Sequence, residues 1–331
     1  MTPARAHTTQ AAHAALVAGA IDVAVIGGGP AGLAAATGLK RAGVERVVVL
    51  EREAQAGGVP RHCGHYPFGM WELHRVLRGP DYAARLVARA LAAGVELHVQ
   101  TTVTALTPGP VLEITTPEGP ATLAPARVLY ATGMRETPRA ARLIGGARVA
   151  GVMNTGALQA MVYLEHLRPF RKPLIVGSEL VAFSAIMTCR HAGIRPVAMI
   201  EPGPRPRAFR LAPAYPALHA IPFYSRTRLL EIEGARGVEA AIVEGPRGRR
   251  RIACDGVILS GDFTPEAALA RMGYLPLDPA TGAPAETARF RTEDPHVFTA
   301  GNIRGGVRTA GASWREGQAV VAEILASLGG G

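Results

Sequence analysis

The chain has 331 residues, enough for about two domains of ordinary size and for a substantial hydrophobic core. Hydrophobic residues make up 48% and charged residues 19%, which argues against disorder, and three cysteines are too few for a disulfide framework. The formal net charge is +10, but the arginines that carry it are scattered along the chain, so a nucleic-acid-binding stripe is not expected.

Residues 1–20 are rich in Ala, Thr and His and lack the apolar core of a signal peptide, so we expect a loose N-terminal tail and, by default, a cytoplasmic location. No apolar run reaches about 18 residues, so no transmembrane segment is expected. The two dense arginine runs, 205–210 and 247–251, lie among Pro and Gly turns and are interpreted as solvated surface. Docking to an acidic protein, or peripheral contact with an anionic membrane, is the alternative.

The first predicted elements form a strand–turn–helix–strand unit. Val23–Ile26 is a short apolar run typical of a buried parallel strand, and the glycine-rich turn 27–32 follows it at once. A helix of small residues is predicted over Leu33–Ala42, and a second apolar strand, Arg46–Leu50, ends at Glu51. The order of these segments predicts a βαβ unit.

The middle of the chain predicts one helix followed by short strands. The helix begins at Pro80 and stops at Gly94. The strands that follow it, before the sequence Ala131-Thr132-Gly133, are Val95–Val103, Val111–Thr115, Ala121–Leu123 and Val128–Tyr130.

The pattern then restarts with the same spacing between its first glycine and its final acid. The second unit consists of the strand Pro173–Val176, the turn at Gly177, the helix Leu180–His191 and the strand Val197–Ile200, which ends at Glu201. The remaining predicted elements are a meander over Thr227–Val243, a strand over Gly256–Ser260 and a last helix over Trp314–Leu325. The chain therefore repeats one nucleotide-binding plan.

Each part of the first unit has a function in binding a dinucleotide. Gly27 allows the tight turn, Gly29 lets a pyrophosphate approach the backbone, and Gly32 lets the helix pack closely on the strand. The helix N-terminus attracts phosphates, and Glu51 can accept hydrogen bonds from ribose hydroxyls. Because strand, helix and acid all accompany the glycines, a dinucleotide site is favoured over a glycine-tolerant loop.

Three segments together resemble the two-dinucleotide-domain flavoproteins. They are residues 25–33 with Glu51, Ala131-Thr132-Gly133, and residues 297–302, which end in Asn302 where many relatives have Asp. The resemblance implies an α/β fold of two Rossmann-like three-layer domains, the second inserted into the first, with FAD bound in the first. It implies that the FAD-binding residues are Gly27, Gly29, Pro30, Ala31, Gly32, Glu51, Arg52, Gly58, Val103, Ala131, Thr132, Gly133, Gly301, Asn302 and Ala310.

The two repeats also predict the domain boundaries. The FAD-binding domain is expected to comprise residues 21–147 and 265–331, and the second nucleotide domain residues 148–264. The last helix should begin near residues 309–313 and direct the positive end of its dipole toward the flavin.

The second glycine motif departs from the family pattern. Its sequence is Gly177-Ser178-Glu179, so a glutamate stands where a bare glycine would admit the pyrophosphate. Two unit charges about 4 Å apart interact by about 4 kcal/mol at an effective dielectric constant of about 20, enough to oppose dinucleotide binding. We therefore predict that NAD(P)H is not a proper substrate. The alternatives are that Glu179 points away, or that Glu201 holds the ribose of a nucleotide that does not react.

The region after Gly57-Gly58 lacks the redox dithiol of disulfide reductases. Cys63 has no nearby cysteine, which disfavours thioredoxin-reductase activity and an iron–sulfur cluster within the chain. The catalytic residues stay unknown, and the candidates are His62, Cys63 and His65. They either border the flavin, where an imidazole could move a proton, or form a polar loop. They lie too close together for the usual structural metal site, so no metal is expected.

The stretch 57–86 narrows the resemblance to the α subunits of hetero-oligomeric proline, hydroxyproline and opine dehydrogenases and of hydrogen cyanide synthase. This implies an FAD-dependent oxidoreductase subunit that relays electrons. A second flavoprotein subunit would oxidise the amino acid, imino acid or opine, and a small iron–sulfur protein would be a further partner. A stand-alone NAD(P)H-dependent flavin reductase and a non-catalytic flavin-bound scaffold are the alternatives.

Overall fold

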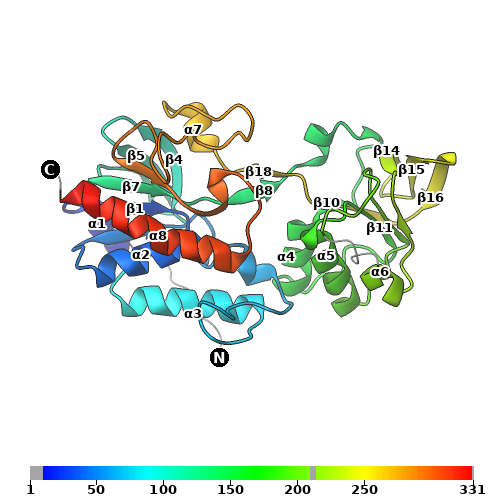
Figure 1. Ribbon diagram of the computed structural model, residues 1–331, viewed down its shortest axis with the longest axis horizontal. Helices are drawn as coiled ribbons and strands as arrows, with labels where there is room; N and C mark the ends of the chain where they lie inside the picture. The colour runs from blue at the N-terminus through cyan, green and yellow to red at the C-terminus, as the bar shows by residue number, and fades with distance from the viewer. Residues whose placement is uncertain (1–9, 209–213, 330–331) are drawn as a thin grey trace. The chain divides into compact units, whose positions relative to one another are not determined.

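A computed structural model describes residues 10–208 and 214–329. The chain divides into two compact units, each built on its own parallel sheet (Figure 1). The first unit contains the chain up to Arg61, Tyr66–Arg135 and the chain from Thr264 onward; the second contains His62–His65 and Glu136–Phe263. The predicted α/β fold with two Rossmann-like domains is confirmed.

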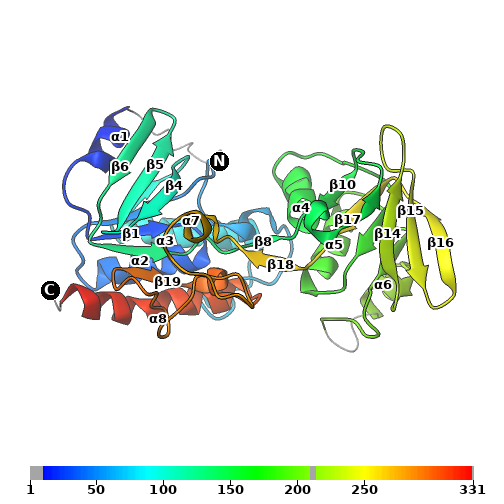
Figure 2. The same ribbon diagram turned by 90° about the horizontal axis from the view of Figure 1, so that it is seen from above.

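The first unit is built on a five-stranded parallel sheet in the order β19-β7-β1-β2-β3. Its strands are β1 (Val23–Ile26), β2 (Val47–Leu50), β3 (Glu96–His98), β7 (Arg127–Tyr130) and β19 (Val297–Thr299). One face carries the helices α2 (Pro30–Arg41), α3 (Gly79–Ala92) and α8 (Ala310–Leu328). The other face carries the antiparallel strands β4 (Thr102–Thr107), β5 (Val111–Thr116) and β6 (Gly119–Leu123), with α1 (Gln10–Val17) and α7 (Ala268–Met272) nearby (Figure 2).

Strand alternation divides the core of this unit into two layers. Val23 and Val25 of β1 pack on the helical side, whereas Ala24 and Ile26 pack under the meander. All four residues are buried, which explains why the sequence shows a continuous apolar run rather than an alternating one.

The second unit repeats this plan with the strand order β10-β17-β11-β12-β13. Its sheet strands are β10 (Val152–Asn154), β11 (Pro173–Val176), β12 (Ala198–Ile200), β13 (Phe223–Tyr224) and β17 (Gly256–Leu259). The helices α4 (Thr155–Tyr163), α5 (Leu180–His191) and α6 (Ala214–Leu218) contribute to one core layer. The other layer lies under a four-stranded sheet of β9 (Gly145–Gly146), β14 (Arg228–Glu233), β15 (Ala240–Gly245) and β16 (Gly248–Ala253).

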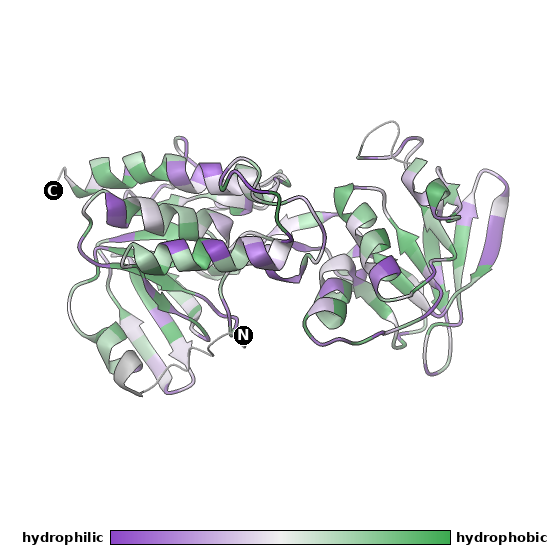
Figure 3. Cartoon of the chain, turned by 90° about the horizontal axis from the view of Figure 1, so that it is seen from below, coloured by the Kyte–Doolittle hydropathy of each residue, from purple (hydrophilic) through white to green (hydrophobic). Residues whose placement is uncertain are grey.

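The remaining elements are short. The strands β8 (Met134–Glu136) and β18 (Phe263–Pro265) pair with each other where the chain passes between the units. The 3-10 helices are η1 (Val59–His62), η2 (Arg139–Arg142) and η3 (Gly301–Arg304). Figure 3 shows apolar residues concentrated in the central strands and hydrophilic ones on outward helical turns. Among the described residues, no helix combines the length and the apolar character that crossing a bilayer requires.

Several predicted elements differ from the observed ones. Residues 10–17 form α1, with Leu16 fully buried, where a loose tail was expected; residues 1–9 lie outside the described ranges. The predicted strand over Val95–Val103 is interrupted between β3 and β4, because β3 joins the parallel sheet and β4 starts the meander. Helix α4 was not predicted, since its sequence combines Gly156 with few polar positions to mark a face.

Candidate cofactor and redox site

The glycine turn between β1 and α2 is shaped by close backbone contacts. Gly27 has a φ of +106°, and a Cβ there would lie 2.6 Å from the carbonyl oxygen of Ala131. A Cβ on Gly32 would lie 2.0 Å from the carbonyl oxygen of Gly27. These two glycines are therefore required by the fold of the turn itself, because any side chain would collide with backbone.

Gly29 and Gly133, in contrast, border open space. A Cβ on Gly29 would meet nothing closer than the Cα of Gly58 at 4.0 Å, and one on Gly133 would meet nothing within 4 Å. Gly29 is the N-cap of α2 and no side chain caps that helix, so its first-turn N–H groups stay open to an anion. The turn thus has the bare surface and the donors that the pyrophosphate of FAD needs.

Glu51 lies at the end of β2 and is buried. Its Oε2 accepts a hydrogen bond from the Gly28 N–H at 2.9 Å, and its Oε1 accepts one from the Glu53 N–H at 2.9 Å. Burial raises the pKa of Glu51, and these two backbone donors oppose that rise. The carboxylate is therefore fixed beside the turn, with lone pairs remaining for hydroxyl donors. Arg52 beside it is exposed and pairs with Glu53 at 3.7 Å.

The late motif packs against the first turn of α2. Gly301 has a φ of +80°, and a Cβ there would lie 2.8 Å from the Ala31 Cβ. Asn302 accepts hydrogen bonds from the Arg308 N–H at 3.0 Å and the Ser313 hydroxyl at 3.3 Å, and it donates to the Arg308 carbonyl at 3.2 Å. The structure therefore brings the late motif to the glycine turn, and it shows Asn302 closing the loop before α8.

Other predicted FAD residues are placed as follows. Thr132 donates a hydrogen bond to the Glu266 carbonyl at 2.9 Å, and Gly58 approaches Gly29, where a Cβ on Gly58 would lie 2.9 Å from the Gly29 Cα. Val103 in β4 packs against the core under the meander. Gly58 and Thr132 thus flank the turn, whereas Val103 is held mainly by core packing.

The first turn of α8 lies against a buried acid, Glu72, that the sequence did not indicate. Thr309 caps this helix by accepting from the Ala312 N–H at 3.3 Å, and α8 begins at Ala310. A Cβ on Gly311 would lie 2.2 Å from Glu72 Oε1, so the Glu72 carboxylate lies against the first turn of α8. Glu72 is buried and accepts from the Tyr82 hydroxyl at 3.2 Å. No local sequence signal identifies this contact, because the two segments are far apart in the chain.

The second glycine turn, residues 177–182, holds the Glu179 side chain across its opening. Glu179 Oε2 lies 3.0 Å from a Cβ built on Gly177 and 2.1 Å from one built on Gly261. Glu179 therefore spans the ends of β11 and β17, where the corresponding turn of the first unit is open. The alternative that this side chain points away from the turn does not describe the structure.

An arginine in the run interpreted as solvated surface holds Glu179 in place. The Arg207 guanidinium lies 2.7 Å from Glu179 Oε1 and 2.9 Å from Asp262 Oδ1. Hydrogen bonding to these acids raises the pKa of Arg207. The sequence alone did not indicate this role. The Arg207 charge partly neutralises the Glu179 carboxylate, which was expected to repel a pyrophosphate as an isolated charge. Arg210 of the same run lies outside the described residues.

Glu201 reproduces the placement of Glu51 in the second unit. Its Oε1 accepts from the Gly203 N–H at 2.8 Å, and its Oε2 accepts from the Ser178 hydroxyl at 2.5 Å. Ser178 also accepts from the Arg207 N–H at 3.0 Å. In the first unit the backbone of Gly28 fills the place of the Ser178 hydroxyl, so the repeat extends to the hydrogen bonds of its acid.

Cys63 lies in a buried polar cluster of the second unit. Its thiol is 3.6 Å from Gln159 Oε1. Burial, and then the charge of Glu136, raises the pKa of Cys63 to about 12. Glu136 itself accepts from the Gly156 N–H at 2.7 Å, and burial raises its pKa too. The Cys63 thiol is therefore held in its unreactive, protonated form.

The neighbours of Cys63 are less buried than it is. His62 and His65 are both half-buried, and a Cβ on Gly156 would lie 3.8 Å from the His62 ring. All three cysteines of the chain are buried, and none of them forms a disulfide. Within the described ranges, no group of three or more His, Cys, Asp or Glu side chains is arranged to hold a metal ion.

Comparisons with known proteins agree with this architecture. Lactococcus lactis thioredoxin reductase is similar with a TM-score of 0.78 and 19% identity, over 94% of this chain and 99% of that chain. T. acidophilum thioredoxin reductase is similar with a TM-score of 0.76 and 20% identity, over 92% and 97%. L-proline dehydrogenase from P. horikoshii is similar with a TM-score of 0.72 and 20% identity, over 94% of this chain and 56% of that chain.

No curated protein is significantly similar to the sequence. The family model of the pyridine nucleotide-disulphide oxidoreductases, however, matches residues 21–317. The predicted FAD cofactor and oxidoreductase class are thereby confirmed. Since the match covers most of the chain, this protein belongs to the pyridine nucleotide-disulphide oxidoreductase family and is an FAD-dependent oxidoreductase.

Proposed function

We propose that this oxidoreductase is the electron-relaying flavoprotein subunit of a hetero-oligomeric dehydrogenase acting on an amino acid, imino acid or opine. The observation that carries the proposal is the Glu179 carboxylate across the second glycine turn, held there by Arg207. A chain that does not take electrons from NAD(P)H must receive them from another donor. A second flavoprotein subunit that oxidises the substrate supplies such a donor, and a small iron–sulfur protein supplies an outlet.

Two further observations support this proposal. The three cysteines are buried, form no disulfide and stand far apart in the sequence, so the chain lacks the closely spaced dithiol that passes electrons to a disulfide. L-proline dehydrogenase from P. horikoshii has the same fold over 94% of this chain, and it is named for the oxidation of an imino acid. The resemblance to subunits of hydrogen cyanide synthase stays a prediction.

The first unit supplies the proposed FAD site. We propose that Gly29, Ala31 and Gly32 present backbone to the pyrophosphate, and that Glu51 accepts from the ribose. Ala131 and Thr132 lie against Gly27 of this turn, and Gly301 lies against Ala31. When bound, the flavin supplies the electron-transfer chemistry, and the protein supplies position and electrostatics.

The first experiment is the visible spectrum of the purified chain, followed by anaerobic addition of NADH and NADPH. We expect a flavin spectrum that neither nicotinamide bleaches rapidly. Rapid bleaching at micromolar cofactor would instead make the chain a self-sufficient NAD(P)H-dependent flavin reductase. A colourless protein that FAD cannot reconstitute would refute the proposed FAD site.

The relay and a non-catalytic scaffold are distinguished in the assembled complex. Copurification with a dehydrogenase subunit is expected for both. Reduction of this chain's flavin by the substrate of that subunit is expected only for the relay.

A further inference from the structure

The 68–77 loop of the first unit is anchored at both ends and exposed at its tip. Phe68 and Leu77 exchange two backbone hydrogen bonds of 2.9 Å. Between them, Trp71 is 72% exposed and Val76 is 61% exposed. Large apolar side chains this exposed on a fixed loop are typical of protein interfaces, in which Trp is enriched at the energetic centre.

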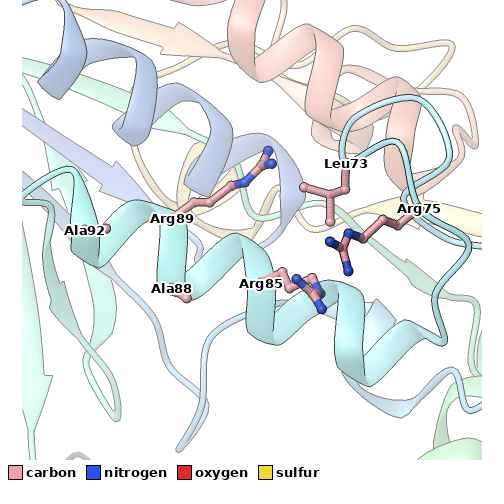
Figure 4. A pocket seen from close by; sticks show the side chains of 6 residues that line it. All are labelled: Leu73, Arg75, Arg85, Ala88, Arg89 and Ala92. Atoms are coloured by element: carbon pink, nitrogen blue, oxygen red, sulfur yellow. The ribbon is translucent and has the colours of Figure 1, made fainter.

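A basic cavity of about 260 Å³ lies beside this loop, against α3. Its walls combine Leu73, Ala88 and Ala92 with the arginines Arg75, Arg85 and Arg89. Figure 4 shows the guanidinium groups of Arg75 and Arg85 pointing toward each other, while Arg89 points away. Arg89 also lines the cavity, but it donates to the Glu72 carbonyl at 3.2 Å and so is held by the loop.

Arg75 and Arg85 have no ion-pair partner among the residues that the structure describes. The nearby acid on the loop, Glu72, is buried against α8 and Tyr82 and cannot neutralise them from the surface. Two converging guanidiniums over an apolar floor match a carboxylate on an aliphatic stem.

We propose that the 68–77 loop and the Arg75–Arg85 cavity form the docking surface for an acidic protein partner. The partner inserts a glutamate or aspartate side chain between Arg75 and Arg85 and packs an apolar side chain on Trp71. The proposal rests on the proposed relay function, which requires a protein partner. The position of this docking surface suits electron transfer. Glu72 of the same loop lies against the first turn of α8, which is the helix expected to face the flavin.

The probe is a fluorescein-labelled peptide in which glutamates alternate with leucines, titrated against the FAD-loaded protein. Its matched control has glutamine in place of every glutamate. We expect anisotropy to report binding of the acidic peptide only, with affinity falling as salt rises. Tryptophan fluorescence of the protein, with an unlabelled peptide, is a second readout, and because Trp314 is partly buried its change should come mainly from Trp71.

The variant R75E/R85E should weaken binding of the acidic peptide by about tenfold or more, because it reverses both charges that meet the carboxylate. R41E/R271E is the matched control, since it changes two exposed arginines of the same unit by the same net charge. It should change the affinity by less than about twofold. Trp71→Ala should also weaken binding, which a purely electrostatic attraction would not show.

Equal losses in both double variants would overturn the proposal, because they would show general charge attraction. If millimolar inorganic phosphate displaces the peptide and Trp71→Ala leaves the peptide affinity unchanged, the cavity is an adventitious ion site only. Binding to phosphatidylserine vesicles in place of the peptide would indicate a membrane surface. None of these binding results depends on NAD(P)H. Bleaching of the flavin by NADH would therefore refute the relay function, whereas the peptide titrations alone decide on the docking surface.

Discussion

Substitution of Glu179 by glycine should convert the second glycine turn into one that admits a pyrophosphate. The carboxylate lies 2.1 Å from a Cβ built on Gly261, so removing it clears the space between the ends of β11 and β17. The backbone at Glu179 has φ −69° and ψ 170°, an extended conformation that glycine adopts without strain. The side chain makes no capping hydrogen bond to α5, so the helix does not lose a cap.

The expected magnitude follows from the charges. A carboxylate about 4 Å from a phosphate costs about 4 kcal/mol at an effective dielectric constant of about 20. Arg207, 2.7 Å from Glu179 Oε1, offsets part of this cost, and its half-exposed guanidinium is screened by water. If about half of the cost remains, its removal strengthens NADH binding by about 2 kcal/mol, or about 30-fold in Kd. The lost surface ion pair should lower the free energy of unfolding by less than about 1 kcal/mol.

The assay combines NADH fluorescence titration with anaerobic stopped-flow absorbance of the flavin. Glu179→Gln keeps the size of the side chain and removes its charge, so it separates a steric block of NADH binding from an electrostatic one. If only Glu179→Gly binds NADH more tightly, the volume of the side chain excludes the pyrophosphate. If both variants gain affinity equally, its charge does. Tight NADH binding by the wild-type protein, or no gain in affinity in either variant, would show that Glu179 does not block the turn.

Other substitutions test the first unit and the thiols. Gly29→Ala should fold normally but bind FAD about tenfold or more weakly, because its Cβ enters open space that the pyrophosphate needs. Gly32→Ala should instead lower the free energy of unfolding by about 3 kcal/mol, because its Cβ would collide with backbone. FAD content and thermal denaturation of the two variants distinguish these outcomes, and equal behaviour would contradict them. Because the pKa of Cys63 is raised to about 12, its thiol should resist alkylation at pH 8 in the native protein. The free energy of unfolding should also fall as pH rises above about 9, because there the thiol ionises only in the unfolded chain. Mass spectrometry of alkylated native and denatured protein checks the first point, and denaturant titrations of wild type and Cys63→Ser at pH 8 and pH 10 check the second. Asn302→Asp, although it restores the residue of many relatives, should destabilise the protein by about 1 to 3 kcal/mol, because a carboxylate would face the Arg308 carbonyl that Asn302 Nδ2 now bonds at 3.2 Å. Denaturant unfolding of the apoprotein measures this loss, and an unchanged midpoint would show that the loop closes without that bond.

The repeated strand–turn–helix–strand plan and the glycine turn of the first unit could be predicted from the order of residues alone. These features depend on neighbouring residues: Val23–Ile26 is apolar at every position because a central parallel strand is buried on both faces, and Gly27 and Gly32 are required by backbone contacts within one turn. The family resemblance carried in the same segments predicted FAD and the oxidoreductase class, which the family match confirmed. The individual FAD-contacting residues stay proposals.

Which distant side chains meet could not be predicted from the sequence, because it depends on the packing of the folded chain. Arg207 joins Glu179 and Asp262, and Glu72 reaches the start of α8, through contacts between segments that no local pattern relates. The direction of the Glu179 side chain and the convergence of Arg75 with Arg85 are likewise set by packing. A charged side chain in a sequence is compatible with solvent, with an ion pair or with a ligand, and the choice among these is made by the neighbours that folding brings to it.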